Sequence, residues 1–370
     1  MGFREHAAPV RRILGIALAV LLLGGVIAVA LAGGEDEPPT ATKTVKGVIG
    51  SEKSEYFRDP DVVKALADKG YTVKTETSGS WAMDQLALKD FDFAFPGSSE
   101  PAPEIEAAAG VKGAQTTKPF FSPLVVIARS NAAKVLVDNG LATTNGKNSG
   151  TLLMGPYLKA AAEDRKWQQL SGSAAFAELT GTVFIKTTDP TTSNSGALFL
   201  AATSNVANDK TVVSDEAGID RTAPLMQKLI RVQGALEPST DDPFRAFISG
   251  SGEPLILAYE SQVASLLQQK PGPGATDGMV VLYPDTTVNS PHTFVPISEK
   301  AKELGSLLAN DPKLRELAVR HGFRPQNGVA EFTAATAAHA AYLNPELTGI
   351  RQVSAPTVKI LMALAARAKS

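Results

Sequence analysis

Short apolar segments and polar turns alternate along residues 44–100 and predict strands and helices in turn. Strands are predicted at 44–50, 71–76 and 91–95, because each is a short segment rich in β-branched or aromatic residues between polar turns. A helix is predicted at 61–69, where apolar residues recur at helical spacing and a glycine follows, and another begins at the polar turn 77–80. Three successive strand–helix units favour a parallel sheet with covering helices.

The alternation continues through the middle of the chain. Further strands are predicted at 123–128, 254–259 and 279–283, and a helix at 224–236. From Ser298 onward the pattern is mostly helical. The predicted fold class is therefore α/β.

One stretch combines a predicted strand, a polar turn and a predicted helix. Residues 183–187 are apolar and β-branched and predict a buried strand, which Asp189-Pro190 ends because proline cannot donate to a sheet ladder. Hydroxyl and amide side chains at 191–195 then precede an apolar helical segment. Free N–H groups and the positive end of a helix dipole would point into this turn, which suits a small anionic or polar ligand. An ordinary helix N-cap explains the same residue types.

Serines follow the ends of several predicted parallel strands. They occur at Ser51, at Ser78 with Ser80, at Ser98 with Ser99, and in the turn 193–195; these turns are far apart in sequence. In open α/β sheets, ligands bind outside the carboxyl ends of the strands. We therefore expect these turns to converge on one ligand-binding cleft.

The N-terminal segment has the pattern of a membrane or export signal. Three arginines precede an uncharged apolar segment, 13–32, which is long enough to span a bilayer as a helix with its N-terminus in the cytoplasm. Ala30 and Ala32 also fit a signal-peptidase site. Residues 1–34 are thus predicted to be a signal peptide or a membrane anchor, and 35–43 a linker. Either alternative places the rest of the chain outside the cytoplasm, anchored at the membrane or released into the cell envelope or medium.

Composition narrows the function classes. The chain has 370 residues, 44% hydrophobic and 20% charged, with a net charge of −2, which is typical of a folded protein. Its basic residues are scattered, so nucleic-acid binding has no support. The chain has no cysteine, which excludes a lipoprotein anchor, disulfides and cysteine-ligated metals.

The sequence gives no support for catalysis. It has no G-x-S-x-G turn, phosphate-binding loop or H-E-x-x-H pair. Neither His292 nor His321 has a carboxylate at metal-ligand spacing, so no metal and no cofactor are predicted. The neighbouring carboxylates Glu52 with Glu55, and Asp241 with Asp242, lie in polar turns and are expected to be solvated. We predict that the protein is not an enzyme.

Four stretches resemble a known family. Residues 71–80 with 91–99 look like an early strand, a serine-rich helix start and a third strand, and 121–127 looks like a strand entering a crossover. Residues 257–262 look like a strand that brings a tyrosine to the cleft. The fourth stretch comprises 283–285, 291–294 and 320–325, which look like the return crossover and a late helix end. The chain thus resembles bacterial extracellular solute-binding proteins of the type II periplasmic-binding-protein fold, the group that includes molybdate-type binders.

The resemblance implies two α/β lobes that are joined by two crossovers and close on a ligand by hinge motion. Lobe one is expected at 44–128 plus 290–370, and lobe two at 129–289. The implied function is to capture a small polar or anionic ligand, such as an oxyanion, in the cleft between the lobes for a membrane permease. The alternative is a membrane-anchored sensor or interaction module with the same fold, which an uncleaved helix at 13–32 would favour.

In molybdate-type relatives, hydroxyls and backbone amides from both lobes hold a tetrahedral oxyanion. By position, the resemblance carries this role to Ser51, Ser78, Ser195 and Tyr259. Glu260 departs from the pattern, because a carboxylate in the cleft would repel an oxyanion. The full set of predicted ligand-binding residues is Ser51, Ser78, Ser80, Ser98, Ser193, Asn194, Ser195 and Tyr259.

Overall fold

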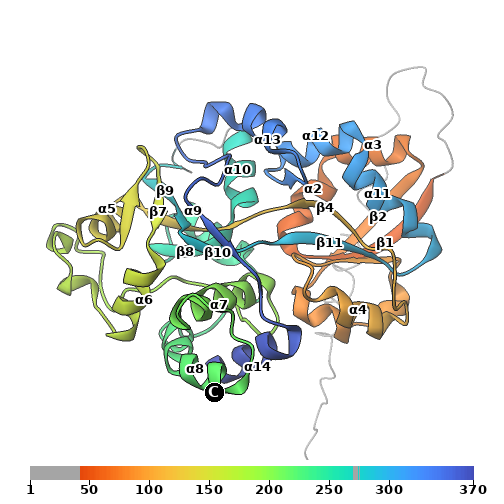
Figure 1. Cartoon of the computed structure of the whole chain (residues 1–370). Coiled ribbons are helices and arrows are strands. Elements are labelled where there is room, and N and C mark those ends of the chain that lie inside the picture. Colours follow the sequence, from red (N-terminus) through yellow and green to blue (C-terminus); the bar gives the residue numbers. More distant parts are fainter. Residues whose placement is uncertain (1–41, 270–273, 275) are drawn as a thin grey trace, which may run out of the picture. The chain divides into compact units, whose positions relative to one another are not determined.

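The computed structural model describes residues 42–269, 274 and 276–370. Within these residues, two mixed β-sheets with helices packed around them form two lobes (Figure 1). No helix in this part of the chain has both the length and the apolar character needed to cross a membrane. The predicted signal or anchor at 13–32 lies outside the described residues, as does the linker up to residue 41.

The first sheet defines lobe one and has the strand order β12-β4-β11-β3-β1-β2. Its strands are β1 (Lys43–Ile49), β2 (Tyr71–Thr77), β3 (Phe93–Phe95), β4 (Thr117–Phe121), β11 (Pro291–Pro296) and β12 (Arg324–Pro325). β1 pairs in parallel with both β2 and β3, which confirms the parallel arrangement predicted for this part of the chain. β11 is antiparallel to β3 and β4.

The second sheet defines lobe two and has the order β6-β7-β9-β5-β8. Its strands are β5 (Leu124–Arg129), β6 (Ala142–Thr144), β7 (Ser149–Leu152), β8 (Leu255–Tyr259) and β9 (Met279–Pro284). β5 lies between β8 and β9 and is antiparallel to both. The chain therefore crosses between the sheets at Ser122-Pro123, earlier than the expected boundary after residue 128.

Helices cover both sheets. Those of lobe one are α2 (Ser54–Arg58), α3 (Pro60–Asp68), α4 (Ala102–Ala109), α11 (Lys302–Asn310) and α12 (Pro312–Arg320). Those of lobe two are α5 (Ser130–Asp138), α6 (Met154–Ala162), α7 (Asn194–Ala207), α8 (Glu216–Arg231), α9 (Asp241–Ile248) and α10 (Glu260–Gln268). α13 (Val329–Thr336) packs against α12 and β12.

The C-terminal segment returns to lobe two. β10 (Thr286–Val288) pairs in parallel with β13 (Arg351–Val353), and α14 (Val358–Lys369) then packs against α7 and α8 (Figure 1). Buried Leu361 and Ala365 of α14 belong to the same apolar cluster as α7. The expectation that 290–370 lies wholly in lobe one therefore fails beyond β13. The sequence shows an apolar helix face at this point but not the lobe on which it packs.

Three predicted elements differ from the structure. The segment 183–187 is extended, but Lys186 makes the single bridge recorded within it, to Ile256 of β8, and the Thr187 N–H donates to the Gln233 side-chain oxygen at 2.7 Å. The helix predicted after Ser80 is the 3₁₀ helix η2 (Ser80–Gln85). α8 begins at Glu216, before the predicted 224, since the Asp215 carboxylate caps it by accepting from the Gly218 N–H at 2.8 Å.

Lobe one is held by an aromatic core beneath the sheet. Phe93 stacks on Phe294 with ring centroids 4.7 Å apart, and Phe120 stacks on Phe323 at 4.3 Å. Such pairs stabilise a core by about 0.5–1.5 kcal/mol beyond the area they bury. The core thus gives the strand ends of lobe one a rigid base.

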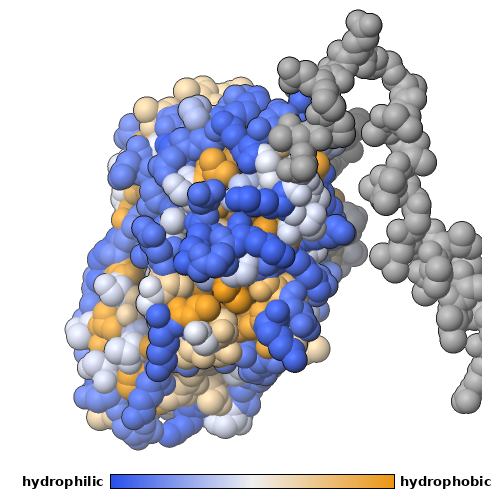
Figure 2. All heavy atoms as spheres, turned by 90° about the vertical axis from the view of Figure 1, so that its right-hand side faces the viewer, coloured by the Kyte–Doolittle hydropathy of each residue, from blue (hydrophilic) through white to orange (hydrophobic). Residues whose placement is uncertain are grey.

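Outside this core, Figure 2 shows a face whose upper part is covered mostly by hydrophilic residues, with hydrophobic residues gathered below the middle.

Candidate functional site

A small cavity lies where turns from both lobes meet. The space outside the protein atoms at this place is about 260 Å³, open solvent included. Its lining residues are Gly50, Ser51, Glu52, Ser78, Gly79, Ser80, Ser193, Asn194, Ser195, Pro238, Ser239, Thr240 and Tyr259. Every predicted ligand-binding residue except Ser98 is among them, so the structure brings the predicted turns together. Their role toward a ligand remains a prediction.

The lobe-one side of the cavity is built from two turns that follow parallel strands. β1 leads into the 3₁₀ helix η1 (Ser51–Lys53), and β2 leads into η2. The residues before these helices are Gly50 and Gly79, and neither helix start has a side-chain cap. At η1 the N–H groups of Ser51 and Glu52 have no acceptor among the described residues, whereas at η2 the Trp81 N–H already has one in the Thr192 carbonyl oxygen. Ser80 is held in place because its Oγ accepts from the Gly97 N–H at 2.9 Å.

The lobe-two side is built on the N-terminus of α7. Ser193 is the N-cap, but its side chain makes no capping hydrogen bond. The N–H groups of Asn194, Ser195 and Gly196 have no acceptor in the part of the chain that the structure describes. A helix N-terminus with free N–H groups and its dipole is a ready site for an anion. The sequence prediction for this turn therefore agrees with the observed backbone.

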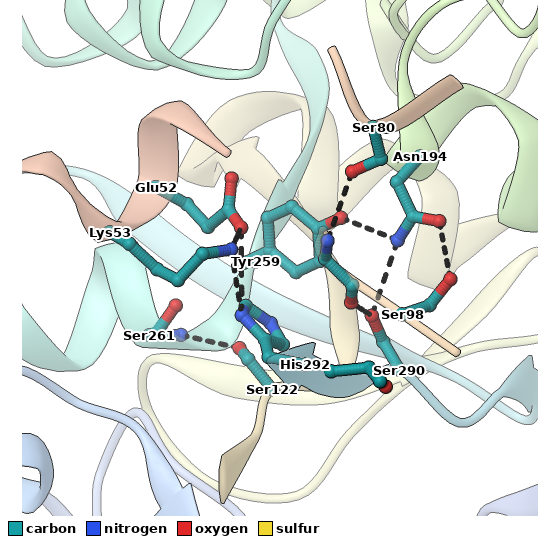
Figure 3. A network of polar contacts seen from close by, with 12 residues as sticks. Glu52, Lys53, Ser80, Ser98, Ser122, Asn194, Tyr259, Ser261, Ser290 and His292 are labelled. Atoms are coloured by element: carbon teal, nitrogen blue, oxygen red, sulfur yellow. Dashed lines mark hydrogen bonds and ion pairs between the residues drawn. The ribbon is translucent and has the colours of Figure 1, made fainter. Parts of the chain in front are cut away.

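Asn194 ties the two lobes together across the cavity (Figure 3). Its Oδ1 accepts from the Ser98 hydroxyl at 2.6 Å, and its Nδ2 donates to the Tyr259 hydroxyl oxygen at 2.9 Å. Ser98 thus supports the cavity from behind instead of lining it. Burial, and then the nearby Glu52, raise the pKa of Tyr259 far above its ordinary value. The Tyr259 hydroxyl therefore stays protonated and can donate a hydrogen bond.

A charged cluster that the sequence prediction missed lies against the cavity. The Glu52 carboxylate is 6% exposed and pairs with Lys53, which is completely buried (Figure 3). Lys53 Nζ lies 3.2 Å from Nδ1 of His292. Burial, and then Lys53, hold the pKa of His292 well below its ordinary range, so its neutral ring accepts from the ammonium. Burial lowers the pKa of Lys53, and the contact with the Glu52 carboxylate opposes this shift.

Glu260 does not enter the cavity. Its side chain is fully buried, and Arg324 Nη2 donates to Oε1 at 2.7 Å. The Tyr283 hydroxyl also donates to this oxygen. The carboxylate that departed from the family pattern is thus paired elsewhere and does not oppose an anion in the cleft.

Close backbone contact joins the lobes beside the cavity. The Trp81 N–H donates to the Thr192 carbonyl oxygen at 3.0 Å. A methyl group added to Gly79 would lie 2.3 Å from the same oxygen. The Trp81 ring is 6% exposed and belongs to the apolar cluster of lobe two, although it follows a strand of lobe one. The structure is therefore a closed arrangement of the lobes.

Asp241, the first residue of α9, also differs from its expected solvated role. Its Oδ1 accepts from Gln262 Nε2 at 3.0 Å. Burial, followed by repulsion from Glu52, raises the pKa of Asp241 from 3.8 to about 6. The ionised carboxylate is therefore less favourable in the folded chain than in the unfolded chain.

Replacing this carboxylate gives a pH-dependent prediction. We expect Asp241→Asn to raise the melting temperature of the ligand-free protein at pH 8, where the folded and unfolded chains both carry the ionised group. The gain should shrink as the pH falls below 6 and vanish only below 3.8, where both are protonated. Thermal melts from pH 4 to 8 measure it. A constant gain across this range would contradict the assignment.

Comparisons with known proteins identify the fold. No family model and no curated protein matches the chain. Similar solved structures include the periplasmic binding protein AfuA from Actinobacillus pleuropneumoniae, with a TM-score of 0.57 and 13% identity over 89% of this chain and 97% of that one. A periplasmic thiamin binding protein has a TM-score of 0.54 and 13% identity over 91% and 100% of the two chains. The substrate binding protein of an ABC transporter from Agrobacterium tumefaciens also has a TM-score of 0.54 and 13% identity, over 90% and 95%.

These similarities support the type II periplasmic-binding-protein fold, with two mixed α/β lobes. The similar proteins are binding proteins, not enzymes. The narrower resemblance to molybdate-type binders stays a prediction. At this level of identity the similarity shows the fold, and the site has to be argued from its own residues.

Proposed function

We propose that this protein is an extracytoplasmic solute-binding protein that captures a small anionic or polar molecule between its lobes. The supporting observation is that turns separated by more than a hundred residues line one cavity, from both lobes. One similar structure is that of a periplasmic thiamin binding protein. Another, that of the periplasmic binding protein AfuA, has fructose-6-phosphate bound. The ligand would pass to a membrane permease, and the apolar segment 13–32 would direct export or hold the protein at the membrane.

Hydrogen bonds would supply the affinity. The serine hydroxyls, the neutral Tyr259 hydroxyl and the free N–H groups at the start of α7 can donate to the oxygens of one small ligand. Donors that are already desolvated and fixed lose little entropy when they bind. Both lobes contribute donors, so the ligand favours the closed state over the open one.

The test is a binding screen followed by two substitutions. Thermal-shift measurements with phosphate, sulfate, molybdate and sugar phosphates identify a ligand, since binding to the folded chain raises its melting temperature. We expect Ser195→Ala and Tyr259→Phe each to weaken that ligand by about 1–3 kcal/mol, through loss of a buried hydrogen bond. Titration calorimetry measures the change.

Ser171→Ala is the matched control, because this serine is exposed and does not line the cavity. It should leave the affinity unchanged. Wild-type affinity in both Ser195→Ala and Tyr259→Phe would remove these residues from the site.

A further inference from the structure

A second pocket opens beside the cavity and shares Ser51 and Glu52 with it. The space outside the protein atoms at this place is about 730 Å³, open solvent included. Residues of α2, α9 and α10 line it, so it too lies between the lobes. Phe244, Ile248 and Leu266 give it an apolar wall. A molecule whose head fills the cavity could extend its remaining part into this pocket.

The polar lining of the second pocket is mainly acidic. Glu52, Glu55 and Asp241 contribute three carboxylates, and Arg245 is the one cationic side chain among the lining residues of this pocket. Of the three, Glu55 pairs with the exposed Arg58 at 3.7 Å, and Asp241 has no ion-pair partner among the described residues. Lys53 already pairs with Glu52 and is fully buried. Burial, and then repulsion from Glu52, raise the pKa of Asp241 to about 6 although Arg245 opposes the shift, so the ionised Asp241 is unfavourable here. A cation in the pocket would relieve this repulsion.

Two buried polar atoms at the same pocket lack a hydrogen-bond partner among the described residues. Ser261 is 1% exposed and His321 is 7% exposed, and both line the pocket. Ser261 Oγ and His321 Nδ1 have no hydrogen-bond partner among the described residues. Buried polar atoms are normally paired, so these two require an explanation.

The tautomer of His321 sets the chemistry of its free nitrogen. His321 Nε2 lies 2.7 Å from Asp59 Oδ2. The Asp59 carboxylate is ionised, since contacts with His321, the Asp61 N–H and Arg320 outweigh burial and lower its pKa to about 2. An ionised carboxylate only accepts, so Nε2 donates. When the ring carries a single proton, Nδ1 is then an acceptor, and Ser261 Oγ can accept as well.

We infer that the ligand is a zwitterion, with an oxyanion head in the cavity and a primary ammonium group in the second pocket. This inference rests on the proposed function and deepens it. An ammonium carries a positive charge and three N–H donors, which match the carboxylates and the unpaired acceptors. The apolar wall accommodates the short hydrocarbon chain that joins the two ends. Ser51 and Glu52 line both the cavity and the pocket, so the two adjoin at these residues.

Matched probe pairs test this inference by calorimetry. The pairs are O-phosphoethanolamine with ethyl phosphate, and taurine with ethanesulfonate, whose members differ in the amine. We expect the wild-type protein to bind the amine-bearing member of at least one pair at least tenfold more tightly. In Asp241→Asn the ratio of the two affinities should fall toward one. Asp242→Asn is the matched control, because Asp242 is the next residue of α9 and does not line the pocket, and it should keep the wild-type ratio.

The outcomes separate the inference from the proposed function. Equal affinity for both members of each pair, or a preference that Asp241→Asn leaves intact, overturns the zwitterion while the solute-binding function stands. Binding of inorganic oxyanions without binding of any probe also overturns it, because the second pocket then holds no tail. If no anion of any kind binds, the proposed function fails and the inference fails with it.

Discussion

Gly79→Ala is expected to hold the two lobes apart and to weaken ligand binding strongly. The added methyl group would lie 2.3 Å from the Thr192 carbonyl oxygen of the other lobe. A backbone oxygen cannot move away by changing a rotamer, so the lobes have to separate. Gly79 itself has φ −63° and ψ 138°, values that alanine adopts without strain. The substitution therefore acts on closure and not on the local fold.

The expected result is a larger radius of gyration in small-angle X-ray scattering and a lower apparent affinity. If the closed form falls to a few per cent of the population, the affinity falls roughly 10–100-fold, because the apparent dissociation constant scales inversely with the competent fraction. Scattering needs no ligand, so this measurement can be made first.

Gly155→Ala is the control for this substitution. Gly155 lies in α6, has no atom near its added methyl group, and does not have a positive φ. Its scattering and affinity should match those of the wild-type protein, with a small gain in stability from the helix. If Gly79→Ala gave the same scattering curve and affinity as Gly155→Ala, the Gly79–Thr192 contact would have no part in closure.

The sequence predicts the cavity better than it predicts the cavity's electrostatics. Serines at the ends of predicted strands could be assigned to one cleft, because the ends of parallel strands meet at one edge of a sheet. The burial of the Glu52–Lys53 pair could not be predicted from the sequence. A charged turn is normally solvated, and the partner that helps to bury this one, His292, lies far along the chain.

The lobe boundaries show the same limit. The predicted strand at 123–128 is correct as a strand, but its sheet depends on pairing with β8 and β9, whose residues come more than a hundred positions later. The apolar face of α14 likewise finds its partners in α7 and α8. The spacing of apolar residues identifies a helix or strand and its buried face, whereas contacts with residues distant in the sequence decide where that element lies.

The buried Glu260–Arg324 pair joins α10 of lobe two to β12 of lobe one and gives the largest expected effect on stability. The Arg324 side chain is 3% exposed and the Glu260 side chain 0%. Arg324 also donates to the Asn344 carbonyl oxygen at 2.8 Å, and its guanidinium lies 4.0 Å from the Phe332 ring centroid. We expect Arg324→Met to lower the free energy of unfolding by about 3–5 kcal/mol, because it leaves a buried carboxylate without its cation. Urea unfolding at pH 7 measures this change.

Two further variants show whether the isolated charge is the cause. Arg367→Met removes an arginine that pairs with Glu216 and Asp220 at the surface, so its cost should stay below about 1 kcal/mol. The double variant Arg324→Met with Glu260→Met removes both buried charges and should recover much of the lost stability, since a buried ion pair gives little net stability over well-packed apolar side chains. A cost for Arg324→Met no larger than that for Arg367→Met would mean that water reaches Glu260 and that the lobes are not joined through this pair.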